Sequence, residues 1–283
     1  NVEEVQEMLC GMVEQLIRSK LLYPYRLLGH YFLMAIDATG MLSFDVRHCP
    51  QCMTRKHGSG TIYYHPVLEA KLVTENGFAF SLMTEFIENP HEAVSKQDCE
   101  IKAFRRLAPR IKKRFPRLPI ALLGDGLYAE GPVFDICKEY KWKFIVTLKD
   151  NDLPFVNTEF KKLLPLQFKN HLTFFPAKHK PTRQDFCWVH DIEYVDTQKR
   201  QHLLSVLQCL ETTKDKATST KYKWVTNLNL DYNNVYTVAN KGGRQRWKIE
   251  NQGFNAQKNG GFGLEHVYSN NPVASKIFYL LMQ

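Results

Sequence analysis

The sequence predicts a mixed α/β fold, and three observations support this prediction. Residues 31–37 and 118–124 are short segments that are apolar on both faces, which is typical of strands at the centre of a sheet. Two further apolar segments flank residues 75–77, where Asn-Gly is a hairpin signal. Residues 2–20 instead repeat their apolar side chains at helical spacing, so a helix precedes the first strand.

The order of the predicted elements narrows the fold class. Along the chain, these elements are helix 2–20, strands 31–37, 65–73 and 78–87, helix 91–115, strand 118–124, helix 133–140 and strand 143–148. A helix, three meandering strands and then alternating helices and strands are the order expected of a ribonuclease-H-like core. In that core the first and fourth strands lie side by side. Asp37 and Asp125, which end these two strands, would therefore come together.

The rest of the chain predicts an insertion followed by a return to the core. From residue 150 to about 221 the pattern changes to short alternating segments, which predict a β-rich insertion before the last helix of the core. A final core strand is expected at 222–228, and a helix from Val235 onward. The predicted division is a first part of the core over 1–150, the insertion over 151–221, and the C-terminal part of the core over 222–283.

Composition and charge favour a soluble intracellular protein with a polyanionic partner. The chain has 283 residues, 44% of them hydrophobic, which is enough for one large domain or a core domain with an insertion. It contains no run of about eighteen apolar residues and no signal-peptide pattern, so no membrane association is expected. Seven scattered cysteines are typical of reduced thiols in the cytosol. The net charge of +9 and the basic segments 102–117 and 241–248 favour a nucleic acid.

Three carboxylates stand where this fold would build a metal site. Asp37 and Asp125 follow the apolar runs of two strands, and Glu250 lies in the predicted C-terminal helix. Carboxylate oxygens suit Mg²⁺, and two such ions about 3.5 to 4 Å apart catalyse phosphoryl transfer. These residues predict a site that holds two Mg²⁺ or Mn²⁺ ions and cleaves a nucleic acid phosphodiester. Asp45 and Asp135 compete for this role, but neither ends a buried strand.

Basic residues near Glu250 are candidates for contacts to a DNA backbone. Arg246 precedes Glu250 by one helical turn and shares its face, so it can pair with the carboxylate or bind a phosphate. The other candidates are Arg244, Lys248, Lys258 and the basic helix at 102–117. Such contacts hold DNA by its phosphates and read little of its sequence. The large aromatic residues Trp188, Trp224, Trp247 and Phe254 are expected to pack in the core.

A Cys-x-x-Cys pair indicates a second metal site of a different kind. Cys49 and Cys52 supply two soft ligands, whereas a structural zinc ion needs four. His48, His57 and His65 lie nearby in the sequence, and two of them would complete a zinc site. The alternative is an exposed hairpin loop with free thiols, and both interpretations stay open at this point.

The residues around the three carboxylates also carry a family resemblance. The chain has Asp-Ala-Thr-Gly from Asp37, Gly-Asp-Gly-Leu-Tyr around Asp125, and Arg246 four residues before Glu250. In these features, which extend over nearly the whole chain, it resembles the DDE transposases of cut-and-paste insertion sequences with a Tyr-Arg-Glu-Lys signature. The resemblance implies a ribonuclease-H-like fold and Mg²⁺-dependent endonuclease activity on double-stranded DNA. It further implies nicking at transposon ends and strand transfer to target DNA by direct transesterification.

The resemblance has consequences for assembly and location as well. It implies a homodimer on paired transposon ends and a cytoplasmic, nucleoid-associated protein of a prokaryote. Because the sequence begins at Asn1 and stops in an apolar segment, it is expected to be a fragment of a longer chain. Two other functions fit the same residues. A different ribonuclease-H-like nuclease would cut without joining ends, and a catalytically silent transposase relic would bind DNA but no Mg²⁺.

The chain departs from the signature at two positions. The tyrosine of the signature falls on Gly243, and its lysine falls on Gln257, one residue before Lys258. In an α-helix with about 100° per residue, position 257 shares the face of Glu250, whereas position 258 lies about 80° away. Either Lys258 replaces the signature lysine through a local distortion at Gly253, or the phosphate contact is weakened.

Overall fold

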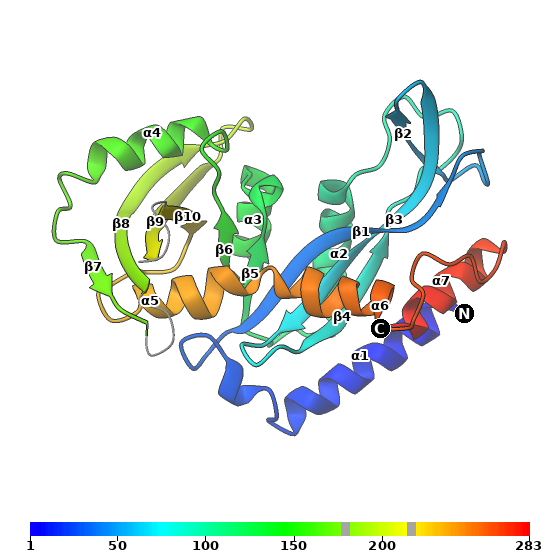
Figure 1. The fold of residues 1–283 in the computed structure, drawn as a ribbon, viewed down its shortest axis with the longest axis horizontal. Helices are drawn as coiled ribbons and strands as arrows, with labels where there is room; N and C mark the ends of the chain where they lie inside the picture. Colours follow the sequence, from blue (N-terminus) through cyan, green and yellow to red (C-terminus); the bar gives the residue numbers. More distant parts are fainter. Residues whose placement is uncertain (177–181, 214–218) are drawn as a thin grey trace. The chain divides into compact units, whose positions relative to one another are not determined.

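The computed structural model describes residues 1–176, 182–213 and 219–283, and these form two compact units (Figure 1). Unit 1 comprises Asn1–Pro24, Met34–Leu118 and Trp247–Gln283. Unit 2 comprises Tyr25–Leu33 and Pro119–Arg246. Each unit combines helices with strands, so the predicted mixed α/β class is confirmed. These units divide the chain at points other than the predicted boundaries at 150 and 221.

Unit 1 is built on four strands, β1 (Phe32–Phe44), β2 (Met53–His57), β3 (Gly60–Val73) and β4 (Ala79–Phe86). Their order is β2-β3-β1, and β4 also pairs with β3. The long strand β3 changes its antiparallel partner along its length. Its first part, Gly60–Tyr64, pairs with β2, and its second part, Val67–Val73, pairs with β4. The predicted hairpin is the β3–β4 connection, where Gly77 adopts a φ of +100°.

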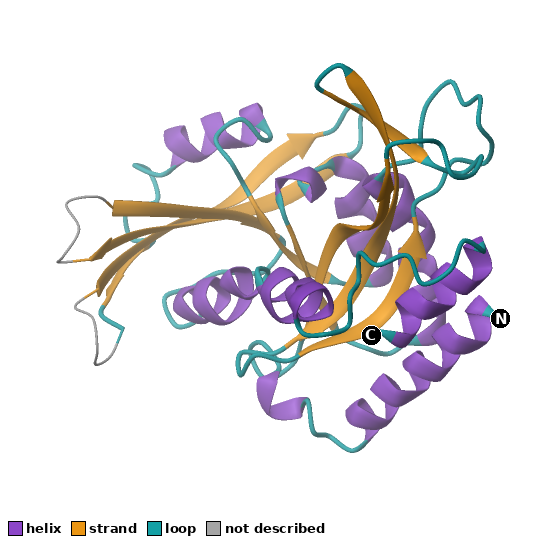
Figure 2. Cartoon of the chain, turned by 45° about the vertical axis from the view of Figure 1, so that its right-hand side comes forward, coloured by secondary structure: helices purple, strands orange, loops and turns teal. Residues whose placement is uncertain are grey.

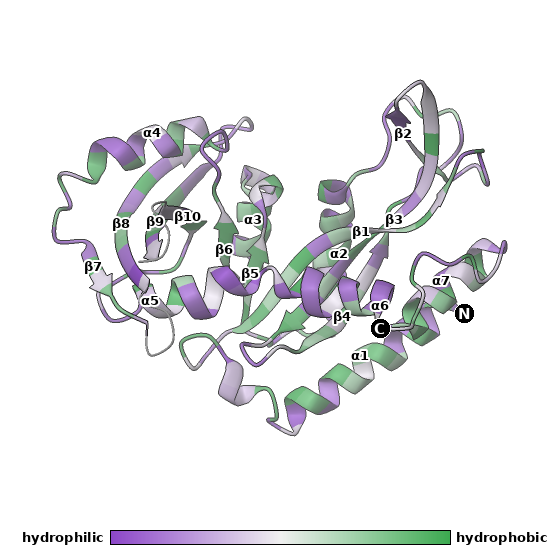
Figure 3. Cartoon of the chain, in the orientation of Figure 1, coloured by the Kyte–Doolittle hydropathy of each residue, from purple (hydrophilic) through white to green (hydrophobic). Residues whose placement is uncertain are grey.

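The helical elements of unit 1 lie beside its strands (Figure 2). They are α1 (Val2–Arg18), α2 (Glu100–Arg114), α6 (Asn255–Asn259) and α7 (Pro272–Leu281), with short 3₁₀ turn η1 (Tyr23–Tyr25) and π-helical segment η5 (Ile249–Phe254). α1 alternates hydrophobic and hydrophilic residues along its length, as predicted (Figure 3). Arg114 of α2 reaches α1 through ion pairs with Glu7 and Glu14, at 3.0 and 2.9 Å.

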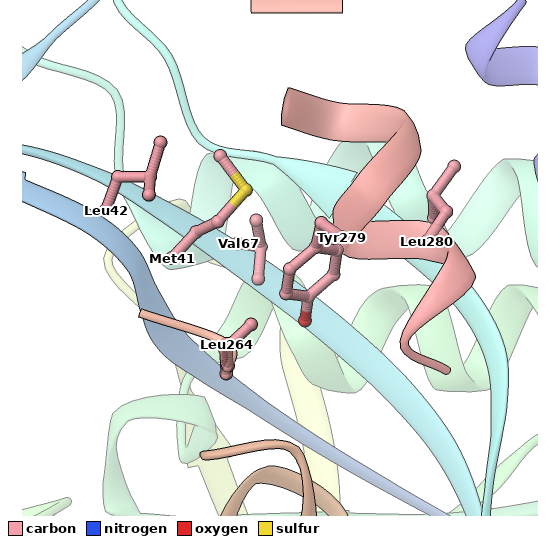
Figure 4. Packing of buried hydrophobic residues seen from close by; sticks show 6 residues of the cluster. All are labelled: Met41, Leu42, Val67, Leu264, Tyr279 and Leu280. Carbon is pink, nitrogen blue, oxygen red and sulfur yellow. The ribbon is translucent and has the colours of Figure 1, made fainter. Parts of the chain in front are cut away.

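A hydrophobic cluster joins the C-terminal helix to the sheet of unit 1 (Figure 4). Its buried members are Met41 and Leu42 of β1, Val67 of β3, Leu264, and Tyr279 and Leu280 of α7. All six side chains are less than 10% exposed. Full burial of a Leu or Val side chain is worth about 1.5 to 3 kcal/mol, so this cluster fixes α7 firmly on β1 and β3.

Unit 2 contains one mixed sheet with the strand order β5-β6-β10-β9-β8-β7. Its strands are β5 (Ile120–Gly124), β6 (Lys143–Thr147), β7 (His171–Phe174), β8 (Thr182–Val195), β9 (Gln201–Thr213) and β10 (Ser219–Thr226). β5 and β6 are parallel, and the other pairs are antiparallel. The predicted β-rich insertion therefore extends the sheet at the edge of β6. At the other edge, the N–H of Phe32 donates to the carbonyl of Pro119 at 2.8 Å.

The helical elements of unit 2 are shorter than those of unit 1. They are η2 (Gly126–Tyr128), α3 (Gly131–Tyr140), α4 (Pro154–Leu163), α5 (Val235–Thr237), π-helical η3 (Val238–Gly242) and η4 (Gly243–Gln245). From Val235 the chain stays helical almost without interruption to Asn259, where α6 ends in unit 1. The structure thus confirms the helix that was predicted to start at Val235.

Three sequence predictions differ from the observed elements. The first strand does not end at Asp37 but continues to Phe44, because Met41 and Leu42 are needed in the core beneath α7. The helix predicted from residue 91 begins at Glu100, since residues 87–99 form a loop that side-chain hydrogen bonds from Asn89 and Gln97 hold. α4 was not predicted at all, and it lies in the segment that was expected to be β-rich.

Candidate functional site

Asp37 lies within strand β1 of unit 1 and is half-buried. The five residues before it, from Phe32 to Ile36, are all buried, and this burial fixes the backbone that carries the carboxylate. One oxygen, Oδ1, accepts a hydrogen bond from the N–H of Ala38 at 3.0 Å. A carboxylate on a rigid, buried strand is a preorganised metal ligand, because little conformational entropy remains to be lost on binding.

Asp125 directly follows β5 in unit 2, as predicted. All five residues of β5 are buried, so the chain leaves the core at this aspartate. Its Oδ1 accepts a hydrogen bond from the N–H of Leu127 at 2.9 Å and thereby caps the turn η2. This geometry fits the ordinary role of an aspartate as a turn cap. The cap uses Oδ1 and does not use Oδ2.

Glu250 lies in the π-helical segment η5 and is exposed to solvent. Among residues 1–176, 182–213 and 219–283, no ion pair occupies its carboxylate. Asp37 and Glu250 belong to unit 1 and Asp125 belongs to unit 2. The convergence of all three carboxylates on one pair of metal ions stays a prediction.

The π-helical segment changes the angular register between Glu250 and the residues that follow it. A π-helix takes about one more residue per turn than an α-helix, so it turns every later position back by about 100°. Position 258 then lies about 20° from the face of Glu250, and position 257 lies far from it. Exposure agrees with this register, because Gln257 is 4% exposed and the side chain of Lys258 is 33% exposed. The local distortion that was one of two alternatives for this region is present in the structure.

Gly253 lies inside the π-helical segment and is in close contact with β3. A Cβ atom at this position would lie 3.0 Å from Cδ of Lys71, which is tighter than ordinary van der Waals contact. Lys71 is 2% exposed, and its ammonium lies 3.6 Å from a carboxylate oxygen of the fully buried Glu69. The absence of a side chain at Gly253 therefore lets the segment approach a buried polar pair on the sheet.

Gly243 stands where the signature has a tyrosine, and the structure gives a packing reason. A Cβ at Gly243 would lie 2.5 Å from Nε1 of Trp224, so no side chain fits there. Trp224 is 3% exposed and its ring stacks on Tyr222 at 6.1 Å between centroids. The aromatic group near this end of the helical run thus comes from β10 and not from the helix itself.

The predicted DNA-binding residues lie in different environments. Arg244 is half-buried: its guanidinium forms an ion pair with Glu211 and lies 4.4 Å from the ring centroid of Tyr222. Lys248 is 6% exposed and donates to the backbone carbonyls of Thr74 and Glu75 at 2.7 and 2.5 Å. Lys248 thus holds the β3–β4 turn, and burial lowers its pKa below the usual value for lysine.

Two further basic residues are partly exposed. Arg246 is half-buried, and Lys258 forms an ion pair with Glu265 at 3.0 Å that leaves part of its side chain exposed. The basic helix α2 uses three arginines inside unit 1. These arginines and their partners are Arg106 with Glu85 and Asp98, Arg110 with Glu85, and Arg114 with Glu7 and Glu14. The exposed cations that remain are Arg105 and Lys113 in α2 and Arg117 shortly after it.

The large aromatic side chains follow the core prediction with one exception. Trp188, Trp224 and Phe254 are each less than 5% exposed, so their assignment to the core is confirmed. Trp247 is 44% exposed, and its assignment to the core was wrong. It lies one turn before Asn251, whose N–H donates to the carbonyl of Trp247 at 3.0 Å. An exposed indole three residues before Glu250 is a surface on which a base can stack.

Two groups of three side chains bring possible metal ligands within 4.8 Å of one another in the part of the chain that the structure describes. They are Asp135, Asp196 and His202 in unit 2, and Cys49, Cys52 and His65 in unit 1. Sequence reasoning missed the first group, because its members are up to 67 residues apart and belong to no spacing motif. The register of β8 and β9 and the turn between them create it.

The group of Asp135, Asp196 and His202 already contains its cation. Arg200 forms ion pairs with Asp135 and with Asp196, the latter at 2.7 Å. The buried Asp196 also accepts hydrogen bonds from the N–H groups of Gln198 and Arg200 at 2.8 and 2.9 Å. Burial raises the pKa of Asp196, but these donors outweigh it and leave the pKa below the usual value. The carboxylates of this group therefore already have a cationic partner and are not an open ligand set.

Among the described residues, no helix combines the length and the apolar composition needed to cross a membrane.

Comparisons with known proteins add no family to these observations. No protein-family model matches the chain, and a search of the curated proteins finds no match.

Proposed function

We propose that this chain is the catalytic part of a DDE-type DNA transposase with a ribonuclease-H-like core. In this proposal Asp37, Asp125 and Glu250 hold two Mg²⁺ or Mn²⁺ ions, and the substrate is double-stranded DNA at transposon ends and at the target. The single observation that carries the proposal is the π-helical segment η5. It turns Lys258 to the face of Glu250 and so supports a Tyr-Arg-Glu-Lys signature in which Gln257 is only an apparent departure.

The ligand set fits hard divalent cations. All three candidate groups are carboxylates, the two aspartates are half-buried beside buried strand residues, and Glu250 is exposed and has no ion pair among the described residues. Hard oxygen donors of this kind prefer Mg²⁺ or Mn²⁺ to softer metals. When bound, two such ions would activate the attacking oxygen and stabilise the leaving oxygen of the phosphodiester.

The chain's own residues would position the DNA for this chemistry. Arg246 and Lys258, which flank Glu250 along the helical run, would bind the phosphates on either side of the scissile bond. Water would attack first and free a DNA 3′-hydroxyl, and this hydroxyl would then attack a target phosphate. Both steps are in-line displacements without a covalent bond to the protein, so the reaction needs positioning and charge and no nucleophilic side chain.

Nicking of supercoiled plasmid in the presence of Mg²⁺ or Mn²⁺ tests the proposal. Asp125→Asn should bind a fluorescent DNA duplex nearly as well as the unchanged chain but should nick at least about a thousandfold more slowly. Asp45→Asn is the matched control, because Asp45 is an exposed aspartate that the proposal does not use. Nicking by Asp125→Asn at the rate of the control would refute the metal site.

A joining assay separates transposition from other nuclease activity. A short duplex with a free 3′-hydroxyl at its end is incubated with plasmid, and covalent joining is measured on a denaturing gel. A transposase joins the two DNAs, whereas a ribonuclease-H-like nuclease only cuts. A chain that binds DNA but neither nicks nor joins with either metal would instead be the silent relic.

A further inference from the structure

A second site, unrelated to the three carboxylates, lies at the base of the β2–β3 hairpin in unit 1. His65 is in β3, and Cys52 immediately precedes β2. Met53 pairs with Tyr64, so the antiparallel register places Cys52 opposite His65. Cys49 returns to the same place through a turn in which the N–H of Cys52 donates to the carbonyl of Cys49 at 3.3 Å. The hairpin register and this turn together bring three soft or borderline ligands to one point.

The distances among these three side chains fit one face of a tetrahedral zinc site. Sγ of Cys49 and Sγ of Cys52 lie 3.6 Å apart, and each lies 3.3 Å from Nε2 of His65. At ordinary zinc bond lengths, a tetrahedron places its two sulfur atoms about 3.8 Å apart and each sulfur about 3.6 Å from a nitrogen. One ion can therefore contact all three atoms with small side-chain shifts.

Polar side chains lie next to the three ligands. Nδ1 of His65 faces Oε1 of Glu88 at 3.9 Å, and the ammonium of Lys276 holds the other oxygen of Glu88 at 2.5 Å. Metal-ligating histidines usually direct their second ring nitrogen at a carboxylate. Asn89 supports the turn as well, because its side chain donates to the carbonyl of Cys52 at 3.0 Å. Cys52 is fully buried and His65 is 7% exposed.

A small cavity adjoins the ligand face. Its volume is about 20 Å³, and its lining includes His48, Cys49, His65 and Glu88. This space is enough for one water molecule, which is the size of one missing ligand. His48 stacks on Phe44 and lines the same cavity, whereas His57 is at the far end of β2, about 17 Å along the strand. The geometry selects His65 among the three histidines and leaves the fourth position toward the cavity.

The contrast with the other ligand group strengthens this assignment. In the group of Asp135, Asp196 and His202, the guanidinium of Arg200 already forms ion pairs with both carboxylates. Cys49, Cys52 and His65 instead contact one another directly, through one sulfur–sulfur and two sulfur–nitrogen contacts. A divalent ion would satisfy all three atoms at once.

We propose that Cys49, Cys52 and His65 bind one zinc ion, with the fourth coordination position open to the cavity. The ion would fix β3 at the residue where its partner changes from β2 to β4, since the two pairings end at Tyr64 and begin again at Val67. A two-stranded hairpin is only marginally stable by itself. The β2–β3 hairpin, which extends beyond β4 in Figure 1, therefore gains a fixed base from the metal.

Metal analysis of the purified chain tests this proposal. The protein is expressed without a metal-binding tag and kept reduced, and its zinc content is measured by mass spectrometry. The expected result is about one zinc per chain, falling below about a tenth in Cys49→Ser and in His65→Ala. Cys99→Ser and His57→Ala are the matched controls, because these exposed residues lie in the following loop and at the hairpin turn. Both should keep their zinc.

A cobalt titration of the unchanged chain makes the test independent of how the variants fold. Co²⁺ bound in place of zinc should give the intense absorption of tetrahedral thiolate coordination, saturating at about one ion per chain. Reduced protein that contains no zinc and shows no such absorption would overturn the proposal. Full zinc content in both ligand variants would overturn it equally.

Discussion

Gly243 in unit 2 and Gln257 in unit 1 are the two positions that differ from the proposed Tyr-Arg-Glu-Lys pattern, and the differences have separate physical causes. At Gly243 close packing excludes a side chain, because the indole of Trp224 fills the space that it would need. At Gln257 the backbone register determines which residue is exposed, because the π-helical segment η5 turns Gln257 to the core and Lys258 toward solvent. The comparison teaches that an apparent gap in a sequence pattern can come from packing at one position and from backbone register at another.

The largest expected change in the free energy of unfolding is at Gly243, where close packing leaves no space for a side chain. Gly243→Ala places a methyl group 2.5 Å from a rigid indole nitrogen and should lower the free energy of unfolding by about 3 kcal/mol. Gly253→Ala is the paired variant, since its methyl group meets the flexible side chain of Lys71 at 3.0 Å. The higher helix propensity of alanine offsets that contact, so the change should stay within about 1 kcal/mol. Urea unfolding measures both, and equal losses would contradict the packing account.

The next largest effect tests the helical register at Gln257. Gln257→Lys restores the signature in residue count but buries an ammonium in a site that is 4% exposed. It should lower the free energy of unfolding by at least about 2 kcal/mol and should not raise DNA affinity. The exposed neighbour Ala256→Lys is the control and should change stability by less than about 0.5 kcal/mol. Tighter DNA binding by a stable Gln257→Lys variant would mean that position 257 faces the DNA.

A smaller effect is expected when the basic side chain itself is removed. Lys258→Gln should weaken binding of a DNA duplex by about threefold to tenfold at moderate salt and reduce the salt slope by about one. Lys161→Gln, on the exposed surface of α4, removes the same charge elsewhere and should have a much weaker effect. Fluorescence anisotropy over a range of salt concentrations separates the two variants. Identical slopes would remove Lys258 from the proposed DNA contact.

The smallest effect is a pH dependence of the free energy of unfolding, which we expect from Glu211, the ion-pair partner of Arg244. Burial raises the pKa of Glu211, but hydrogen bonds from Arg244 and Gln184 outweigh burial and leave the pKa below its usual value. A carboxylate with a lowered folded-state pKa stabilises the protein above its unfolded-state pKa, and this contribution is lost as pH falls through the folded-state pKa. The expected contribution is at most about 1 kcal/mol, because the pair is partly solvated. Thermal unfolding between pH 6 and about pH 3 should therefore depend less on pH in Glu211→Gln.

The sequence was a good guide where a local pattern reflects burial. The fully apolar segment before Asp125 is β5, the Asn-Gly turn joins β3 to β4, and the helical spacing after Asn1 is α1. Each of these elements is determined by side chains close together in the chain, so periodicity and turn chemistry are sufficient to find it.

The sequence was a poor guide where residues far apart decide the structure. Lys248 was expected at the DNA surface, but its ammonium binds the carbonyls of Thr74 and Glu75, which are more than 170 residues earlier. The π-helical register around Glu250 left no mark in the periodicity, because a single extra residue per turn is too local to detect. Trp247 was placed in the core for the same reason, since a purely α-helical register was assumed.

The candidate zinc site lies between these two cases. The Cys-x-x-Cys pair was visible in the sequence, but three nearby histidines, His48, His57 and His65, were candidates to complete the site. Only the pairing of Met53 with Tyr64 selects His65, and only the fold brings Glu88 to its second nitrogen. A motif can thus supply half of a metal site, while the strand register supplies the rest.

The most direct test of the central claim is the rate of Mg²⁺-dependent nicking in Glu250→Gln. Glutamine keeps the size of the side chain and removes the charge that would hold a metal ion. We expect nicking to fall by at least about a thousandfold while DNA binding is retained, because metal ions contribute several kcal/mol of transition-state stabilisation. Glu139→Gln, an exposed glutamate on α3, is the control and should nick normally. Equal nicking by the two variants would contradict the assignment of Glu250 and with it the proposed function.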